Sequence, residues 1–299
     1  MINADRVLLP WHWLRAERAW RRARDLGLPG LEFDRFGRKL GWRMGWRGMR
    51  GKAAMLLHPV VFLRYYEFSF VAESLRDAGG NGLDVSSPFL FSLWLTATRP
   101  DWRVRISNPD ARDSAATAAI VRRLGLERID VSDRDAEALA AEGLTYDAIW
   151  SISVFEHIAG DGDGRALRAL AACLRPGGRL CLTVMCAPSY TEEFVDEDVY
   201  GLGRTRTDRG HFFQRFYDET ALRERLLDAV PGLSVVRTRW IGETRPGSYA
   251  AYAERARRGL RYAWAVEEPL IAAREYQWFE RFADLPGVGA ACLELRKSA

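Results

Sequence analysis

Short apolar runs alternate with amphipathic stretches between residues 82 and 185. Residues 165–174 repeat leucine and alanine at the i, i+3, i+4, i+7 spacing of one helical face, whereas the runs on either side are short and mostly apolar. The pattern predicts strands near 82–85, 102–106, 126–131, 146–151 and 179–185, with helices such as 111–124 and 165–174 between them. Because parallel strands need crossovers of this length, we expect an open parallel sheet covered by helices on both faces.

The downstream sequence extends this α/β pattern. Asp218 can cap a helix that carries Leu222 and Leu226, Asp161 or Asp163 can cap the helix at 165–174, and two more strands are expected near 233–241 and 288–296. The chain therefore predicts a doubly wound, Rossmann-like, mainly parallel sheet of about seven strands. We expect that domain to occupy residues 79–299, with insertions at about 187–215 and 243–286, behind a basic helical extension or lid at residues 1–78.

Charge is unevenly distributed along the chain. The formal net charge is +4, yet the first 55 residues hold 13 Lys and Arg against 5 Asp and Glu, together with five of the 11 tryptophans. Arginine with tryptophan suits nucleic acid, an anionic membrane surface or an acidic partner. We favour an appended helix that docks by its tryptophans and leaves its arginines in solvent, with a lid as the second interpretation. The same segment could also dock on an acidic partner or another subunit.

Several classes of protein are disfavoured. No stretch approaches 18 apolar residues, and the N-terminus has no apolar segment typical of a secretory signal, so we expect neither a transmembrane segment nor export. The four cysteines, Cys173, Cys181, Cys186 and Cys292, show no CxxC spacing and have apolar neighbours. We expect them to be small buried side chains in a reduced cytoplasmic protein without a metal site.

Three segments carry the chemistry. Residues 82–90 read Gly-Leu-Asp-Val-Ser-Ser-Pro-Phe-Leu, residues 147–158 end a strand in Ser-Ile-Ser-Val-Phe-Glu-His-Ile, and residues 174–184 begin Leu-Arg-Pro-Gly-Gly. Together they resemble the class I S-adenosylmethionine-dependent methyltransferases, over residues 82–185 and more weakly to 296. The resemblance implies that S-adenosylmethionine binds over the carboxyl ends of the parallel strands, while the Pro-Gly-Gly segment is a structural turn at the opposite edge.

The first loop departs from the family pattern. Asp84 supplies the usual acidic residue, but Ser86, Pro88 and Leu90 stand where the family has glycines. The resemblance places Asp84, Ser86 and Ser87 at the cofactor, where the two hydroxyls could donate to the methionyl carboxylate near a helix N-terminus. The alternative is a fold that has lost cofactor binding.

The next two strand ends carry the expected nucleoside contacts. Asn108 is the first candidate for the ribose hydroxyls and Asp110 the second, although Asn108 could equally begin a helix. Asp135 with Ala136 resembles the family's adenine-binding segment, with Asp133 as the alternative, and either aspartate could instead cap a helix.

The fourth strand end is where the transferred methyl group is expected. Ser151 and Ser153 are cofactor candidates there, and His157, which titrates near neutrality, is a candidate base with Glu156 beside it. The competing interpretation, slightly favoured, is that the Glu-His pair packs beneath the pocket and supports it.

Two segments outside the core complete the predicted site. Before the first strand, Arg64 and Tyr65 are expected at the methionyl end of the cofactor and Tyr66 among the catalytic residues, unless this run simply packs in an aromatic core. After the fifth strand, His211 is a second candidate base, although a lone histidine is more often structural.

The sequence thus predicts a methyltransferase acting on O, N or C of a small molecule, with a place in specialised metabolism as one possibility. A second hypothesis is an enzyme that attacks the methionyl carbon chain and releases methylthioadenosine, by 3-amino-3-carboxypropyl transfer or by cyclisation to a cyclic amino acid. A third is a non-catalytic methyltransferase fold. No nucleic-acid partner is expected, because residues 151–154 lack the Asn/Asp-Pro-Pro-aromatic signature of base-amine methyltransferases.

Overall fold

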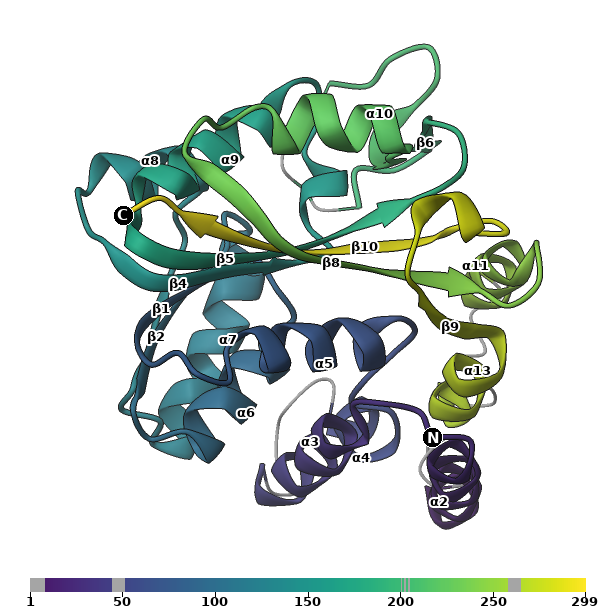
Figure 1. The fold of residues 1–299 in the computed structure, drawn as a ribbon. Helices are drawn as coiled ribbons and strands as arrows, with labels where there is room; N and C mark the ends of the chain where they lie inside the picture. The colour runs from purple at the N-terminus through teal and green to yellow at the C-terminus, as the bar shows by residue number, and fades with distance from the viewer. Residues whose placement is uncertain (1–8, 45–51, 200, 202, 204, 258–264) are drawn as a thin grey trace.

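A computed structural model describes residues 9–44, 52–199, 201, 203, 205–257 and 265–299 (Figure 1). The helices are α2 (Leu9–Asp25), α3 (Leu31–Arg43), α4 (Lys52–Leu57), α5 (Arg64–Ser74), α6 (Leu90–Thr98), α7 (Ala111–Leu124), α8 (Ala136–Ala141), α9 (Gly162–Ala172), α10 (Glu219–Leu222), α11 (Ser248–Arg257) and α13 (Glu268–Glu275), with short η1 (Phe155–His157), η2 (Arg223–Leu227) and η3 (Phe282–Asp284). The strands are β1 (Gly80–Val85), β2 (Trp102–Ser107), β3 (Ile129–Ser132), β4 (Tyr146–Ile152), β5 (Leu174–Cys186), β6 (Thr191–Val195), β7 (His211–Phe216), β8 (Leu233–Glu243), β9 (Tyr276–Phe279) and β10 (Gly289–Lys297).

The predicted doubly wound α/β fold is confirmed. One sheet has the order β3-β2-β1-β4-β5-β10-β8-β9, in which β1 to β5 pair in parallel and β10 is antiparallel to both β5 and β8. The eighth strand, β9, comes from the predicted insertion at 243–286 and pairs antiparallel with β8. The insertion after β5 forms a separate two-stranded ribbon, β6–β7.

Helices cover both faces of the sheet. Figure 1 shows α8, α9 and α10 on one face and α5, α6 and α7 on the other, with α3 and α4 outside the second layer. The strands supply buried side chains to both layers: in β4, Trp150 and Ile152 join the core beneath α5 and α6, while Ile149 joins the opposite core. This alternation explains why the central strands read as continuous apolar runs.

Three local expectations needed correction. The strand expected at 126–131 is β3 at Ile129–Ser132, because Gly125 at φ +63° ends α7 and the Leu126 amide still donates to the helix, at Val121 O. Asp161 stands at the N-cap position of α9 without making a capping bond. The Pro-Gly-Gly segment lies inside β5 as a bulge, since Tyr146 pairs with Leu174 and Ala148 already pairs with Arg179.

The described part of the N-terminal extension packs through aromatic residues. Phe33 of α3 lies 4.5 Å from Trp94 of α6 and 5.3 Å from Phe68 of α5, measured between ring centroids. Trp20 is buried and Trp13 partly so, whereas Trp11 and Trp42 are 57% and 53% exposed, and Trp46 falls outside the described residues. The prediction that this segment packs through its tryptophans therefore holds for Trp20 and in part for Trp13, and not for Trp11 or Trp42. None of the described helices has the length and apolar content needed to cross a membrane.

The side chain of Trp150 on the neighbouring strand leaves no room for a side chain at Gly82. A Cβ atom at this position would lie 2.5 Å from the ring of Trp150, which is fully buried on the adjacent β4. We predict that Gly82→Ala lowers the free energy of unfolding by about 1–3 kcal/mol, because the crowded core must shift to admit the methyl group. Urea unfolding measures the effect. A double-mutant cycle is the control: the same change should cost less beside Trp150→Phe, and an equal cost would contradict the clash.

Candidate active site

A cavity of about 780 Å³ lies at the carboxyl ends of the first four strands. Such a volume suits a small-molecule ligand or cofactor. Its walls come from the loops after β1, β2 and β4 and from the starts of α5, α8 and α9. The lining residues are Arg64, Val85, Ser86, Asn108, Pro109, Asp110, Asp113, Asp135, Ala136, Glu137, Ser153, Val154, Phe155, His157, Ile158, Ala159, Gly162, Arg165 and Ala166.

The loop after β1 exposes one of its three predicted residues to this cavity. Ser86 lines it, in a left-handed conformation (φ +54°) that glycine adopts more readily, and its amide donates to Ser107 O at 2.8 Å. Asp84 and Ser87 are buried and are not lining residues. Asp84 accepts hydrogen bonds from the Ser87 amide and the Ser92 hydroxyl, and burial raises the pKa of Asp84 to about 6. The acidic residue thus holds the loop together.

The loops after β2 and β3 contribute polar groups that also cap helices. Asn108 donates to Asp113 Oδ2 at 2.7 Å, and Asp110 accepts from the Arg112 amide at the start of α7. Asp135 likewise accepts from the Ala138 amide at 2.8 Å and begins α8. Asp110 and Asp135 thus cap helices whose first turns face the cavity, so capping and a place at the cavity go together for these two residues. Burial and the neighbouring Asp110 charge raise the pKa of Asp113.

A carboxylate absent from the sequence predictions organises the end of β4. Glu67 of α5 is fully buried and accepts from Ser153 Oγ at 2.5 Å and from Thr183 Oγ1 of β5 at 2.6 Å. It also pairs with the guanidinium of Arg64, which lines the cavity. Ser153 itself adopts a left-handed backbone, φ +49°. Glu67 lies in no recognisable motif, and only its place one helical turn after Arg64 could have pointed to it.

The Glu-His pair divides between the cavity and the core. His157 lines the cavity, and its Nδ1 lies 2.8 Å from the carbonyl oxygen of Phe213. Since a carbonyl only accepts, Nδ1 carries the proton of this bond. Glu156 is fully buried and is not a lining residue; its carboxylate oxygens make no hydrogen bond within the described structure. Burial raises the pKa of Glu156 to about 8, although the Arg64 charge opposes the rise.

Four other predicted residues lie away from this cavity. Ser151 is buried and donates to Val85 O at 3.0 Å, which ties β4 to β1. Tyr65 and Tyr66 are buried in the aromatic layer, where their hydroxyls donate to Asp34 and to Tyr276 O, and burial raises the pKa of both phenols. His211 begins β7 and pairs with Val195 of the ribbon.

A buried ionic cluster fixes the loop that closes the cavity after β4. Asp163, 1% exposed, accepts from Arg215 at 2.6 Å, Tyr217 at 2.8 Å and Arg225 at 2.8 Å. Burial raises the pKa of Asp163, but Arg225, Arg215 and the Tyr217 hydroxyl outweigh it and hold the pKa below its usual value. Arg215 also donates to Ile158 O and Gly160 O. The β6–β7 insertion therefore clamps a wall of the cavity.

The chain is similar to known proteins in sequence and in fold. Residues 70–236 match the profile of a family described as a methyltransferase domain. Among solved structures, the chain resembles coclaurine N-methyltransferase bound to N-methylheliamine and SAH, at 16% identity and TM-score 0.53, over 99% of this chain and 95% of the other. It also resembles the 4+2 cyclase SpnF, at 20% identity and TM-score 0.51, over 90% and 95% of the two chains. At these identities the structural likeness concerns the fold.

The buried carboxyl of Glu156 predicts a pH-dependent stability. Its pKa of about 8 in the folded chain exceeds the value of about 4.3 expected when unfolded. The stability from this group is therefore fully present below about pH 4.3 and is lost as the pH rises toward 8. Glu156→Gln removes this titration, so the variant should gain stability relative to the unmodified protein between about pH 5 and pH 9.

Urea unfolding across that range measures the difference. The exposed Glu127→Gln is the control, and it should leave the pH dependence of the unfolding free energy unchanged. Parallel curves for Glu156→Gln and the unmodified protein would contradict the prediction.

Proposed function

The chain belongs to the methyltransferase-domain family, and from this premise we propose that it is an S-adenosylmethionine-dependent methyltransferase that acts on O, N or C of a small-molecule acceptor. The observation that carries the proposal is the cavity at the carboxyl ends of β1 to β4, the edge at which open α/β sheets bind their ligands. Charged and polar groups line it at each of the four strand ends.

The residues of this cavity fit S-adenosylmethionine, which when bound would supply an electrophilic methyl group on a sulfonium. Arg64, held by Glu67, offers a guanidinium to the methionyl carboxylate, and Ser86 on the loop after β1 lines the same cavity. Asn108 with Asp110 would hold the ribose hydroxyls. Asp135 and the amide of Ala136 would hold the adenine.

The charge of the wall agrees with this assignment. Four lining carboxylates, Asp110, Asp113, Asp135 and Glu137, stand against two guanidinium groups and His157. An acidic wall favours the positive sulfonium over the neutral product left after methyl transfer. The cation of Arg64 stands on α5, apart from the helix starts that carry the four carboxylates, and it would pair with the methionyl carboxylate.

His157 is the proposed acceptor base. Its ring lines the cavity, and the bond from Nδ1 to Phe213 O fixes the ring so that Nε2 is the basic atom of its neutral form, the atom that would accept a proton from an acceptor hydroxyl or amine. Methyl transfer otherwise depends on positioning, because the sulfonium is already reactive toward an in-line nucleophile. His211 remains the second candidate.

Product analysis tests the reaction. The purified chain is incubated with S-adenosylmethionine and panels of phenols, amines and activated carbon acids, and products are identified by mass spectrometry. We expect S-adenosylhomocysteine together with a product heavier by one methylene. Methylthioadenosine would indicate the carbon-chain reaction that the glycine-free first loop suggests. If calorimetry detects no binding of S-adenosylhomocysteine, the chain is a non-catalytic fold.

The Arg64→Gln variant should bind S-adenosylhomocysteine at least about tenfold more weakly than the unmodified chain, whereas the variant of an exposed arginine, Arg122→Gln, should bind it equally well.

Removal of the proposed base gives a separate prediction. His157→Gln should lower kcat by about 10²–10⁴-fold for an acceptor that must lose a proton, and should abolish the acidic limb of the pH–rate profile. The dissociation constant for S-adenosylhomocysteine should stay within about threefold, which excludes collapse of the site. His211→Gln tests the second candidate, and the same loss of kcat in that variant would assign the base to His211. An unchanged kcat and pH profile for His157→Gln would contradict the role.

A further inference from the structure

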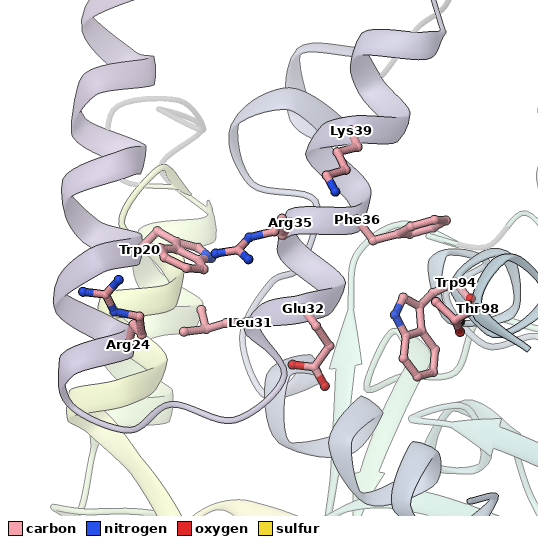
Figure 2. Close-up of a pocket in the computed structure, with 9 residues that line it drawn as sticks. All are labelled: Trp20, Arg24, Leu31, Glu32, Arg35, Phe36, Lys39, Trp94 and Thr98. Carbon is pink, nitrogen blue, oxygen red and sulfur yellow. Dashed lines mark hydrogen bonds between the residues drawn. The ribbon is translucent and has the colours of Figure 1, made fainter.

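A second cavity lies between the N-terminal helices and α6. Its volume is about 350 Å³, and none of its residues lines the cavity at the strand ends (Figure 2). It runs across α3, from α2 on one side to α6 on the other. The lining residues are Trp20, Arg24, Leu31, Glu32, Arg35, Phe36, Lys39, Trp94 and Thr98.

One end of this cavity is cationic. The Arg35 guanidinium lies 4.7 Å from the centroid of the buried Trp20 ring, and that of Arg24 lies 5.8 Å from it. Arg24 pairs with Asp25, but Arg35 and Lys39 form no salt bridge with any described residue. Stacking on a packed indole orients the Arg35 guanidinium while its N–H edge stays available to an anion.

The other end is aromatic. Figure 2 shows Phe36 and Trp94 on the α6 side of α3, opposite the stack of Arg35 on Trp20. Both rings are only partly buried, so each keeps accessible surface at the cavity. Glu32 supplies the one carboxylate of the lining, against three cationic side chains.

The spacing between the two ends is fixed by the core. Neighbouring residues of α3 point inward: Phe33 packs on Trp94, and the buried Asp34 accepts from Arg38 at 2.6 Å and from the Tyr65 hydroxyl at 2.9 Å. These contacts anchor α3 to α5 and α6. The lining residues of α3, which include Arg35, Phe36 and Lys39, therefore stand on a helix anchored to the core, which favours a preformed binding site.

We propose that this cavity binds a small planar aromatic molecule that carries a phosphate or carboxylate group. The anionic group pairs with Arg35 and Lys39, where a guanidinium can make charge-assisted hydrogen bonds. The aromatic body lies against Phe36 and Trp94. A ligand with only one of the two groups would fill the site incompletely. An inorganic anion would leave the rings of Phe36 and Trp94 uncovered, and a neutral aromatic would leave Arg35 and Lys39 without an anion. The site is independent of the proposed methyl transfer.

Titration with three probes tests the proposal on the full chain. Naphthyl phosphate carries both groups, naphthol only the ring and inorganic phosphate only the anion. By calorimetry we expect naphthyl phosphate to bind at least about tenfold more tightly than either of the others. Saturating S-adenosylhomocysteine should leave its affinity unchanged, because the two cavities share no residue.

Variants locate the binding. Arg35→Gln and Trp94→Leu should each weaken naphthyl phosphate at least about tenfold, while Arg22→Gln, an exposed arginine of α2 outside the cavity, should stay within about twofold. Circular dichroism confirms folding; if Trp94→Leu is unfolded, Arg35→Gln decides alone. Equal weakening by Arg22→Gln would overturn the proposal in favour of diffuse charge attraction, and so would competition by S-adenosylhomocysteine or equal affinity for the three probes.

Discussion

The buried carboxylate of Glu67 is the interaction on which the candidate site depends. It lies on α5, outside the sheet, yet it accepts hydrogen bonds from the end of β4 at Ser153 and from Thr183 of β5. The same group pairs with Arg64 and thereby keeps a cation at the cavity wall. A fully buried carboxylate is costly unless such donors surround it, so the loss of any one of the three contacts should destabilise the others. The helix before the first strand is for this reason part of the site.

Asp163 plays the corresponding part on the opposite wall. Its partners Arg215 and Tyr217 come from the insertion after β5, and Arg225 from the helical segment that follows, so sequence far from α9 holds the loop at residues 158–162. Ser86 and Ser153 hold left-handed conformations just after β1 and β4. Such conformations persist where surrounding bonds over-determine them, and both residues line the cavity.

Much of the candidate site could be predicted, because parallel strands bring their carboxyl ends to one edge. Ser86, Asn108, Asp135 and His157 were found by their position after a strand, and all line the same cavity. Asp84 and Glu156 stand at equally suggestive positions but turn into the protein, since side-chain direction depends on packing that spacing does not reveal. The roles of Glu67 and Asp163 escaped prediction because most of their partners are distant in sequence: Ser153 and Thr183 lie 86 and 116 residues from Glu67, and Arg215 lies 52 residues from Asp163.

The sequence by itself determined the α/β order of elements, the parallel core and the family, because hydrophobic periodicity and strand-end motifs are local properties of the chain. It also determined the concentration of arginine and tryptophan in the first 55 residues. Only the tertiary structure decided which polar groups face the cavity at the strand ends and how β9 extends the sheet. It also decided that α2, α3 and α6 meet around a second cavity. These features arise from contacts between segments distant in sequence, where burial, and not local propensity, selects the conformation.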